Sequence, residues 1–237
     1  MRLDARIDKG IDHIHQQHNQ AENQTQQKHA AHDDGIIAAV DRAGHVAADT
    51  GDGEHVLDDD RAAEHHAHAV ADDGDNRNQR IGQRMFEQHF TNARNAGLKV
   101  GVYFFSQAVN ENEAREEAQG CAYVLNGRKL DYPIYFDTEA SGGSNGRADG
   151  LGVEDRTKCA IAFCEEVKAQ GYQPGVYAST LWFRKRIDLN RLKSYSIWNA
   201  HYNVAGSPIA CDMWQGTCTA RIPGYGGQID VNISYVG

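Results

Sequence analysis

The alternation of short apolar runs with longer helical segments after residue 83 limits the fold of this chain more than any other feature. Segments with helical spacing separate strand-like runs at 99–105, 132–136 and 173–179. Strands that alternate with helices form parallel βα units with right-handed crossovers. Shorter connections then join three more strand-like runs, at 196–202, 210–215 and 228–232. The sequence therefore predicts an α/β fold, an irregular TIM-like β/α barrel in which some helices are missing.

The helical segments carry boundary signals of their own. Phe86, Phe90 and Ala93 recur at helical spacing, and Gly97 is a typical stop for that helix. We expect Asn112 to cap the next helix and Asp155 to cap the one after it, because their side-chain oxygens can accept from free backbone N–H groups. Both helices then run from the end of one predicted strand to the start of the next.

Residues 1–83 differ in composition from the rest of the chain. All 20 aromatic residues, all five cysteines and all four prolines lie after residue 83, whereas ten of the 12 histidines lie before it. The first 83 residues carry 17 acidic and 8 basic side chains, and residues 84–237 carry 16 of each. A segment with few large apolar side chains cannot offset its ordering entropy by burial. We therefore expect residues 1–83 to be an acidic, His/Gln/Asp-rich segment that is disordered or atypical, and residues 84–237 to form one domain.

Composition also narrows the classes of partner. A near-neutral domain beside an acidic segment argues against nucleic acid, and the absence of an 18-residue apolar run argues against a membrane span. Nothing near the histidine-rich runs fixes a coordination geometry, so a solvated polar tract is favoured there over a metal site. These runs contain His13, His15 and His18, and then His65, His66 and His68.

The five cysteines neither require nor exclude disulfides. Cys211 and Cys218 flank a short segment and are candidates for a bridge. Cys159 and Cys164 lie together in a predicted helix, where we expect them to be small core residues.

Two carboxylates, Asp137 and Glu139, close the apolar run at 132–136. Residues i and i+2 of an extended backbone point to the same side, about 6.5 to 7 Å apart along the chain. Like charges at this separation raise the pKa of one member, which leaves a protonated acid beside an ionised carboxylate near neutral pH. Cleavage of a glycosidic bond needs such a pair. From this tripeptide alone, two solvated residues at a strand end are the more frequent explanation.

The other predicted strands also end in aromatic and polar residues. The carboxyl ends of barrel strands meet at one face, where active sites form. Aromatic rings stack on the flat C–H faces of sugars, and planar polar groups bind sugar hydroxyls. A single aromatic residue is more often core than ligand, but six successive ends of this kind favour a sugar site. The ends carry Tyr103 and Phe105, Asp137 and Glu139, Tyr177 and Ser179, Trp198 and Tyr202, Trp214 and Gln215, and Asp230 and Asn232.

Six segments of the chain, taken in order, resemble the glycoside hydrolase family 25 lysozymes, which are muramidases that cut peptidoglycan. The matching segments are 97–106, 132–139, 175–179, 198–202, 212–215 and 222–232. The resemblance implies a flattened β/α barrel in residues 84–237. It also implies hydrolysis of the β-1,4 bond between N-acetylmuramic acid and N-acetylglucosamine, with peptidoglycan glycan strands as the partner and without a metal or organic cofactor.

The resemblance further implies roles for individual residues. By motif position, Glu139 is the general acid, Asp137 holds charge beside it and orients the substrate's N-acetyl group or the attacking water, and Asp230 is the third acid. The same resemblance implies a sugar groove lined by Tyr103, Phe105, Tyr177, Trp198, Tyr202, Trp214 and Gln215.

The chain departs from the family pattern at its start. Family members begin with a strand that carries another active-site aspartate in a Gly-Ile-Asp context. Here Asp12 ends a Gly-Ile-Asp segment that lacks the expected aromatic neighbours. The run at 36–40 is the only apolar run that fits a second strand. We therefore expect the N-terminal strands to be absent or atypical, and without them the barrel would have an open seam.

Two other interpretations remain beside the hydrolase. A catalytically impaired carbohydrate-binding module would keep the aromatic groove without cutting the wall, and residues 1–83 could form a metal-binding or interaction arm. The first residues lack the apolar stretch of a signal peptide. A chain that acts outside the cytoplasm on the cell wall must be exported or released by lysis, so this fits a phage-type lysin or a truncated or altered start.

Overall fold

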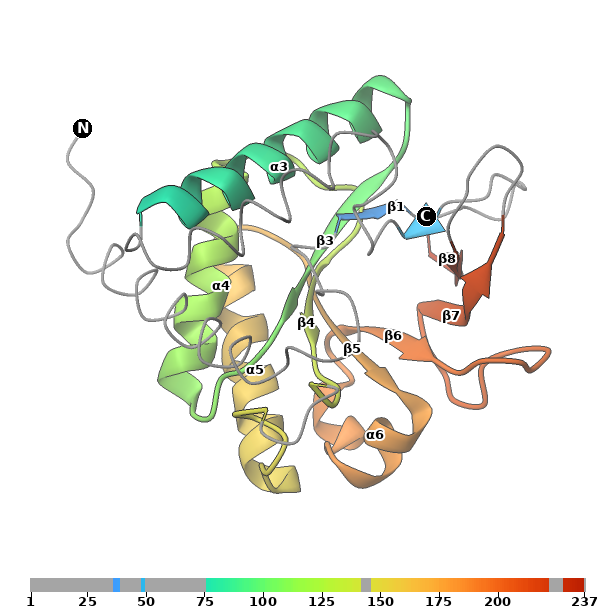
Figure 1. Cartoon of the computed structure of the whole chain (residues 1–237). Helices are drawn as coiled ribbons and strands as arrows, with labels where there is room; N and C mark the ends of the chain where they lie inside the picture. Colours follow the sequence, from blue (N-terminus) through green and yellow to red (C-terminus); the bar gives the residue numbers. More distant parts are fainter. Residues whose placement is uncertain (1–35, 39–47, 50–75, 142–145, 222–227, 237) are drawn as a thin grey trace.

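The computed structural model describes residues 36–38, 48–49, 76–141, 146–221 and 228–236 (Figure 1). Asp12 and both histidine-rich runs lie outside these residues. The described strands form one closed barrel in the order β1-β2-β8-β7-β6-β5-β4-β3. Their bounds are β1 (Ile36–Ala38), β2 (Ala48–Asp49), β3 (Val100–Phe105), β4 (Ile134–Asp137), β5 (Pro174–Ser179), β6 (Ser196–Ala200), β7 (Met213–Ala220) and β8 (Ile229–Ser234).

From β3 to β7 each strand pairs in parallel with the next, as the alternating pattern predicts, whereas β8 is antiparallel to β7. Helix α4 (Glu111–Leu125) joins β3 to β4, and α5 (Val153–Ala169) joins β4 to β5. The short α6 (Thr180–Lys185) and the 3-10 helix η1 (Leu189–Leu192) join β5 to β6. The connection from β6 to β7, which the structure describes throughout, contains no helix. The irregular β/α barrel with missing helices is therefore confirmed.

Two strands from the aromatic-free first part of the chain complete the ring. β1 pairs antiparallel with β3, where Ile37 lies opposite Gly101. β2 pairs antiparallel with both β1 and β8, where Asp49 lies opposite Asp230. At three and two residues, both strands are short, and both run against their neighbours. The N-terminal strands are thus atypical, as predicted, and the apolar run at 36–40 provides one of them.

Two of the predicted helix caps are wrong by a few residues. The cap of α4 is Asn110, whose Oδ1 accepts from the backbone N–H groups of Asn112 and Glu113, each at 3.0 Å. Helix α5 begins two residues before Asp155 and has Gly152 as its cap, without a side-chain hydrogen bond. Asp155 instead places its charge in the first helical turn, where an acidic group complements the helix dipole. Ser179, at the end of β5, caps α6.

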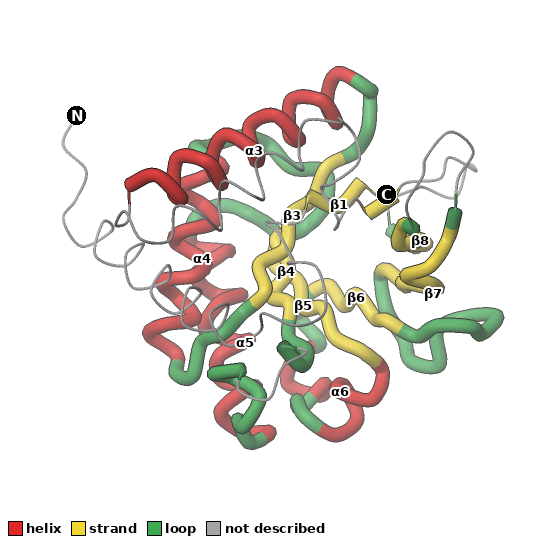
Figure 2. Tube along the Cα trace, viewed as in Figure 1, coloured by secondary structure: helices red, strands yellow, loops and turns green. Residues whose placement is uncertain are grey.

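Two apolar layers hold the barrel, one on each face of its wall. The outer layer lies between the strands and the helices α4, α5 and α3 (Asn76–Asn95), which Figure 2 shows on one side of the sheet. Strand residues that alternate with the outward ones point to the inside. That inner layer contains Tyr103, Tyr132, Tyr135, Tyr177, Trp198, Ala200 and Met213.

A glycine makes room for one ring of the inner layer. Gly175 lies opposite Tyr135 on the neighbouring strand, and a Cβ atom at Gly175 would approach the Tyr135 ring to 2.4 Å. The space allows the centroid of Tyr135 to lie 5.3 Å from that of Trp198. The Gly-Val-Tyr-Ala-Ser segment therefore starts with glycine for a packing reason.

All five cysteines are free thiols, so the candidate bridge between Cys211 and Cys218 does not form. Cys211 packs against the outer apolar layer, whereas Cys218 is exposed on β7. Cys159 and Cys164 are buried in α5, as expected.

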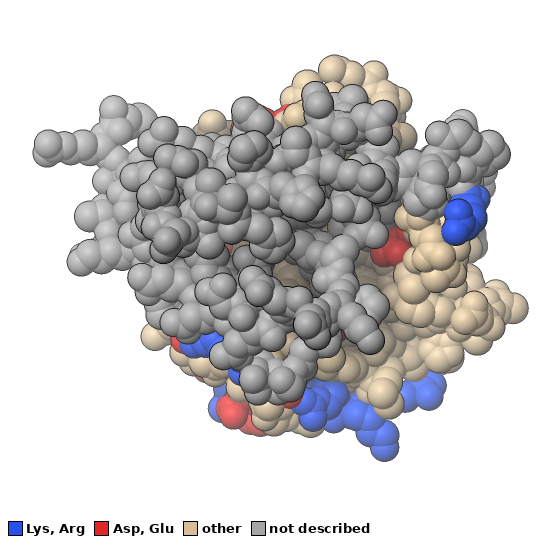
Figure 3. All heavy atoms as spheres, in the orientation of Figure 1, with Lys and Arg blue, Asp and Glu red and all other residues tan. Residues whose placement is uncertain are grey.

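The described surface carries charge of both signs. Figure 3 shows Lys and Arg side chains along the lower edge of this face, where Figure 1 places α6. The last turn of α6 contains Arg184 and Lys185, which suit the negative end of a helix. Among the helices that the structure describes, none combines the length and apolarity needed to cross a membrane.

Candidate active site

The acid couple, Asp137 and Glu139, lies at the carboxyl end of β4. Asp137 is the last residue of the strand and is only 2 % exposed, and Glu139 is half-buried. The N–H of Thr138 donates to Tyr177 O at 3.1 Å, so strand pairing continues beyond Asp137. Thr138 directs its hydroxyl to α5 on the outer side, where it accepts from Arg156. The alternation therefore directs Asp137 and Glu139 to the inner side, as the i, i+2 spacing predicts.

Gln215 links Asp230 to the side of the barrel that carries the acid couple. The Nε2 of Gln215 donates to Asp230 Oδ2 at 2.7 Å. Its Oε1 accepts from the hydroxyls of Tyr177 at 2.7 Å and Tyr202 at 2.8 Å. Tyr177 in turn lies opposite Asp137 in the pairing of β5 with β4. Residues of β5, β7, β8 and the segment after β6 thus meet around one amide, and residue 230 lies on the same side of the barrel as the couple. Asp230 does so from near the start of β8, which is antiparallel to β7, and not from a carboxyl end as expected.

The charges of the three acids act on the same pair of phenols. Burial, followed by the negative charges of Glu139 and Asp137 and by nearby Tyr202, raises the pKa of Tyr177 well above its usual value. Burial also raises the pKa of Tyr202, with Asp230 and Glu139 among the contributing charges. Both phenols therefore remain protonated and act as hydrogen-bond donors to Gln215.

Three of the predicted groove aromatics lie inside the barrel. Trp198 is 2 % exposed, and its ring contacts Tyr103 and Tyr177 edge-on with centroids 6.0 and 4.5 Å away. Its Nε1 donates to Asn232 Oδ1 at 2.8 Å. These rings form the packed interior beneath the acids. The sequence names Asn232 at a strand end but does not identify it as the partner of Trp198.

The remaining predicted groove residues divide between the two faces of the wall. Phe105 lies opposite Asp137 and is half-buried, and Tyr202 is 39 % exposed beside Gln215. Trp214 adjoins Gln215 on β7 and therefore points to the opposite face, where its Nε1 donates to His201 O at 2.9 Å. The structure brings Phe105, Tyr202 and Gln215 together with the acids, but it does not bring Trp214 to them.

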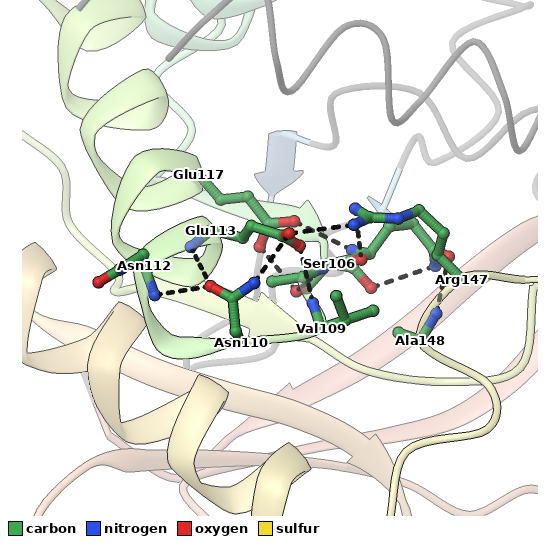
Figure 4. A network of polar contacts seen from close by, with 10 residues as sticks. Ser106, Val109, Asn110, Asn112, Glu113, Glu117, Arg147 and Ala148 are labelled. Atoms are coloured by element: carbon green, nitrogen blue, oxygen red, sulfur yellow. Dashed lines mark hydrogen bonds and ion pairs between the residues drawn. The ribbon is translucent and has the colours of Figure 1, made fainter. Parts of the chain in front are cut away.

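A buried carboxyl group supports the loop that follows β3 (Figure 4). Glu117 of α4 is 1 % exposed, and its carboxyl oxygens accept from Ser106 Oγ at 2.7 Å and from the Gln107 N–H at 3.0 Å. Ser106 N donates to Asp137 O at 2.9 Å. Next to this group, Arg147 pairs with Glu113 at 3.0 Å. The sequence does not single out Glu117, because a glutamate within a helix usually faces solvent.

The burial of Glu117 predicts a pH-dependent stability. Burial, opposed by the hydrogen bonds from Ser106 and Gln107 and reinforced by the charge of Glu113, raises the pKa of Glu117 from 4.5 to about 8. Between these values the folded state binds a proton that the unfolded state lacks, so the free energy of unfolding falls as pH rises from about 4.5 to about 8.

Urea unfolding at several pH values between about 4.5 and about 8 measures the slope of the free energy of unfolding against pH. Glu117→Gln keeps a neutral group in place and is expected to flatten it, whereas Glu111→Gln, at an exposed position of the same helix, is expected to leave it unchanged. Equal slopes for Glu117→Gln and the unaltered protein would contradict the assignment.

Metal coordination finds no support in the described part of the chain. No group of three or more His, Cys, Asp or Glu side chains there could hold a metal ion. The histidine-rich runs lie outside that part, so the expected independence from metal stays a prediction.

Known proteins resemble the chain over the region that contains most of the barrel. The profile of the family described as Glycosyl hydrolases family 25 matches residues 70–225. The autolytic lysozyme of Clostridium acetobutylicum is 22 % identical over 149 residues, which cover 62 % of this chain and 43 % of that protein. The chain therefore spans less than half the length of this curated relative.

Solved structures share the fold. The modular autolysin LytC of Streptococcus pneumoniae superposes with a TM-score of 0.54 at 24 % identity, over 61 % of this chain and 36 % of that one. A second structure of that autolysin contains a synthetic peptidoglycan ligand. The spore cortex lytic enzyme SleM of Clostridium perfringens gives a TM-score of 0.51 at 18 % identity, over 61 % of this chain and 52 % of that one. The family match covers more than half of the sequence, and this chain belongs to glycosyl hydrolase family 25.

Proposed function

We propose that the chain is an N-acetylmuramidase, which hydrolyses the β-1,4 bonds between N-acetylmuramic acid and N-acetylglucosamine in peptidoglycan. The observation that carries this proposal is the gathering of Asp137, Glu139 and Asp230 at one region of the barrel, linked through Gln215. Family membership supports the reaction class, and the peptidoglycan ligand of the pneumococcal autolysin supports the substrate class.

The three acids have different roles in bond cleavage. Glu139 donates its proton to the glycosidic oxygen as the bond from that oxygen to the anomeric carbon breaks. Asp137, buried below it, carries the negative charge that stabilises the positive charge on the sugar ring, and it orients the N-acetyl group or the attacking water. Asp230, held by Gln215, is the third acid.

The groove residues serve the substrate in two ways. Tyr202 and Phe105 retain exposed surface beside the acids and are the rings we expect to contact sugar. Tyr103, Tyr177 and Trp198 support them from the interior, and Gln215 acts by fixing Asp230. Trp214 lies on the other face of its strand, so any effect on substrate passes through the backbone carbonyl of His201.

The substrate implies the place of action. Peptidoglycan lies outside the cytoplasm, so we expect the protein to act on the cell wall after export or after release by lysis.

Incubation of the purified protein with isolated cell walls tests the proposal. Mass spectrometry after borohydride reduction identifies the sugar at each new reducing end. We expect soluble muropeptides that end in reduced N-acetylmuramic acid, with heat-denatured protein as the control. Fragments that end in N-acetylglucosamine would contradict the bond assignment. Binding to the walls without release of fragments would replace the enzyme with a carbohydrate-binding module.

A further inference from the structure

Arg156, in the second turn of α5, is a buried cation next to the acid couple. It is 1 % exposed, and its Nη1 donates to Thr138 Oγ1 at 2.9 Å. Its Nη2 donates to Ala148 O at 2.6 Å and to Asp149 O at 3.5 Å. Thr138 is the residue between Asp137 and Glu139, so the guanidinium joins the couple to α5 and to the loop after residue 145.

The ring of Trp182 packs against the guanidinium, and Arg186 contacts the same ring. The Cζ of Arg156 lies 4.4 Å from the centroid of the Trp182 ring on α6, and Arg186 stands 5.4 Å from the same ring. Arg186 also donates to Asp149 O, one of the acceptors of Arg156. Stacking on an aromatic face together with a planar set of donors gives Arg156 a fixed geometry that a lysine cannot reproduce.

Stability alone gives little reason for a charge at this position. Burial of an ion is costly, and apolar side chains of similar volume often stabilise a core equally well. Burial, together with the nearby positive charge of Arg186, lowers the pKa of Arg156 to about 10, so it remains charged at neutral pH. Its hydrogen-bond acceptors are the hydroxyl of Thr138, between the two acids, and two backbone carbonyls of the loop before α5.

The backbone of the couple is held on the other sides as well. Ser106 N donates to Asp137 O at 2.9 Å, and Thr138 N donates to Tyr177 O at 3.1 Å. These bonds to β5 and to the residue after β3 restrain the main chain, and the hydrogen bond from Arg156 to the Thr138 hydroxyl adds a side-chain restraint on residues 137–139.

We propose that Arg156 is a positioning residue that sets the orientation of Asp137 and Glu139 by holding the Thr138 hydroxyl against α5. The inference rests on the proposed function, because the acid couple is the group that it positions. A displacement of about 1 Å in a catalytic group can reduce turnover by about 100-fold, so the loss of this single hydrogen bond is sufficient to matter.

Thr138→Val tests the proposal because it removes the hydroxyl and keeps the shape of the side chain. We expect kcat on soluble peptidoglycan fragments to fall by about tenfold or more, with KM changed less than about twofold and a displaced pH profile. Arg156→Lys is expected to recover part of the activity that Arg156→Met loses, since it retains a donor.

Thr157→Val is the matched control. Thr157, which lies on α5, is buried like Thr138. Its hydroxyl donates to Val153 O at 2.6 Å and accepts from Asp188 N at 2.9 Å, away from the couple. We expect it to lower the unfolding temperature as Thr138→Val does while kcat and the pH profile stay unchanged. If both variants lose activity only in proportion to their stability, Arg156 is structural and the inference fails.

A spectroscopic measurement separates failure of this inference from failure of the proposed function. Carboxyl carbon NMR follows the titration of Glu139, with Glu165 at the far end of α5 as the reference. We expect Thr138→Val to move the Glu139 titration and not that of Glu165. A moved titration in a protein that releases no muropeptides overturns the muramidase and keeps the positioning role. Muropeptide release with an unmoved titration overturns the positioning role alone.

Discussion

Glu139→Gln is expected to reduce muropeptide release by about 100-fold to 10,000-fold, the range that a general acid contributes. Glutamine has the same shape as glutamate but cannot transfer a proton to the glycosidic oxygen. Glu139 is half-buried at the inner side of the barrel, so the substitution leaves the apolar layers intact. Release of muropeptides is measured together with circular dichroism and the unfolding temperature.

A surface substitution provides the comparison for this experiment. Glu154→Gln removes one negative charge from the start of α5, where Glu154 pairs with Arg191 at 2.8 Å. It is expected to keep full activity. Unchanged activity in Glu139→Gln would remove the assigned proton donor, and a collapsed fold in that variant would show that Glu139 is structural.

Trp198→Ala is expected to lower the free energy of unfolding by about 3 to 5 kcal/mol, as for other large aromatic residues truncated in a core. Trp198 is 2 % exposed and contacts three tyrosine rings of the inner layer. The truncation leaves a cavity there and takes away the donor that Asn232 Oδ1 accepts from. Urea unfolding at a fixed pH measures the loss.

Trp198→Phe separates the cavity from the hydrogen bond. Phenylalanine fills most of the space and lacks the Nε1 donor, so we expect a loss of about 1 to 3 kcal/mol. A small loss of stability in Trp198→Ala, accompanied by weaker binding to cell walls, would instead mean that the indole faces the sugar groove.

The acid couple was predictable because its geometry is local. An apolar run ended by two carboxylates at i and i+2 directs both to one side wherever the backbone is extended, and Thr138 turns to the other side as this requires. The parallel βα units were predictable for the same reason, since each crossover is encoded between neighbouring segments. Resemblance to family 25 then linked Asp230 to the couple across most of the domain.

Exposure of the aromatic residues was not predictable in this way. Trp198 and Trp214 both lie within strand-like runs, yet one fills the interior and the other points to the opposite face, because strand register decides the face. The cap of α4 was misassigned because Asn110 and Asn112 both have suitable side chains, and only the extended backbone of Asn110 fits. Arg156 could not be recognised at all, because a buried helical arginine depends on contacts from distant segments.

The pairing of β2 with β8 has a consequence for how the molecule is made. It places Asp49 opposite Asp230, so β2 cannot find this partner until β8 has been synthesised. The βα units in between can assemble as they leave the ribosome, but the ring is completed only after β8 has been synthesised. Contacts this distant in sequence are slow to form. We therefore expect a nascent chain that is stopped before β8 to bind chaperones more than one in which β8 has emerged.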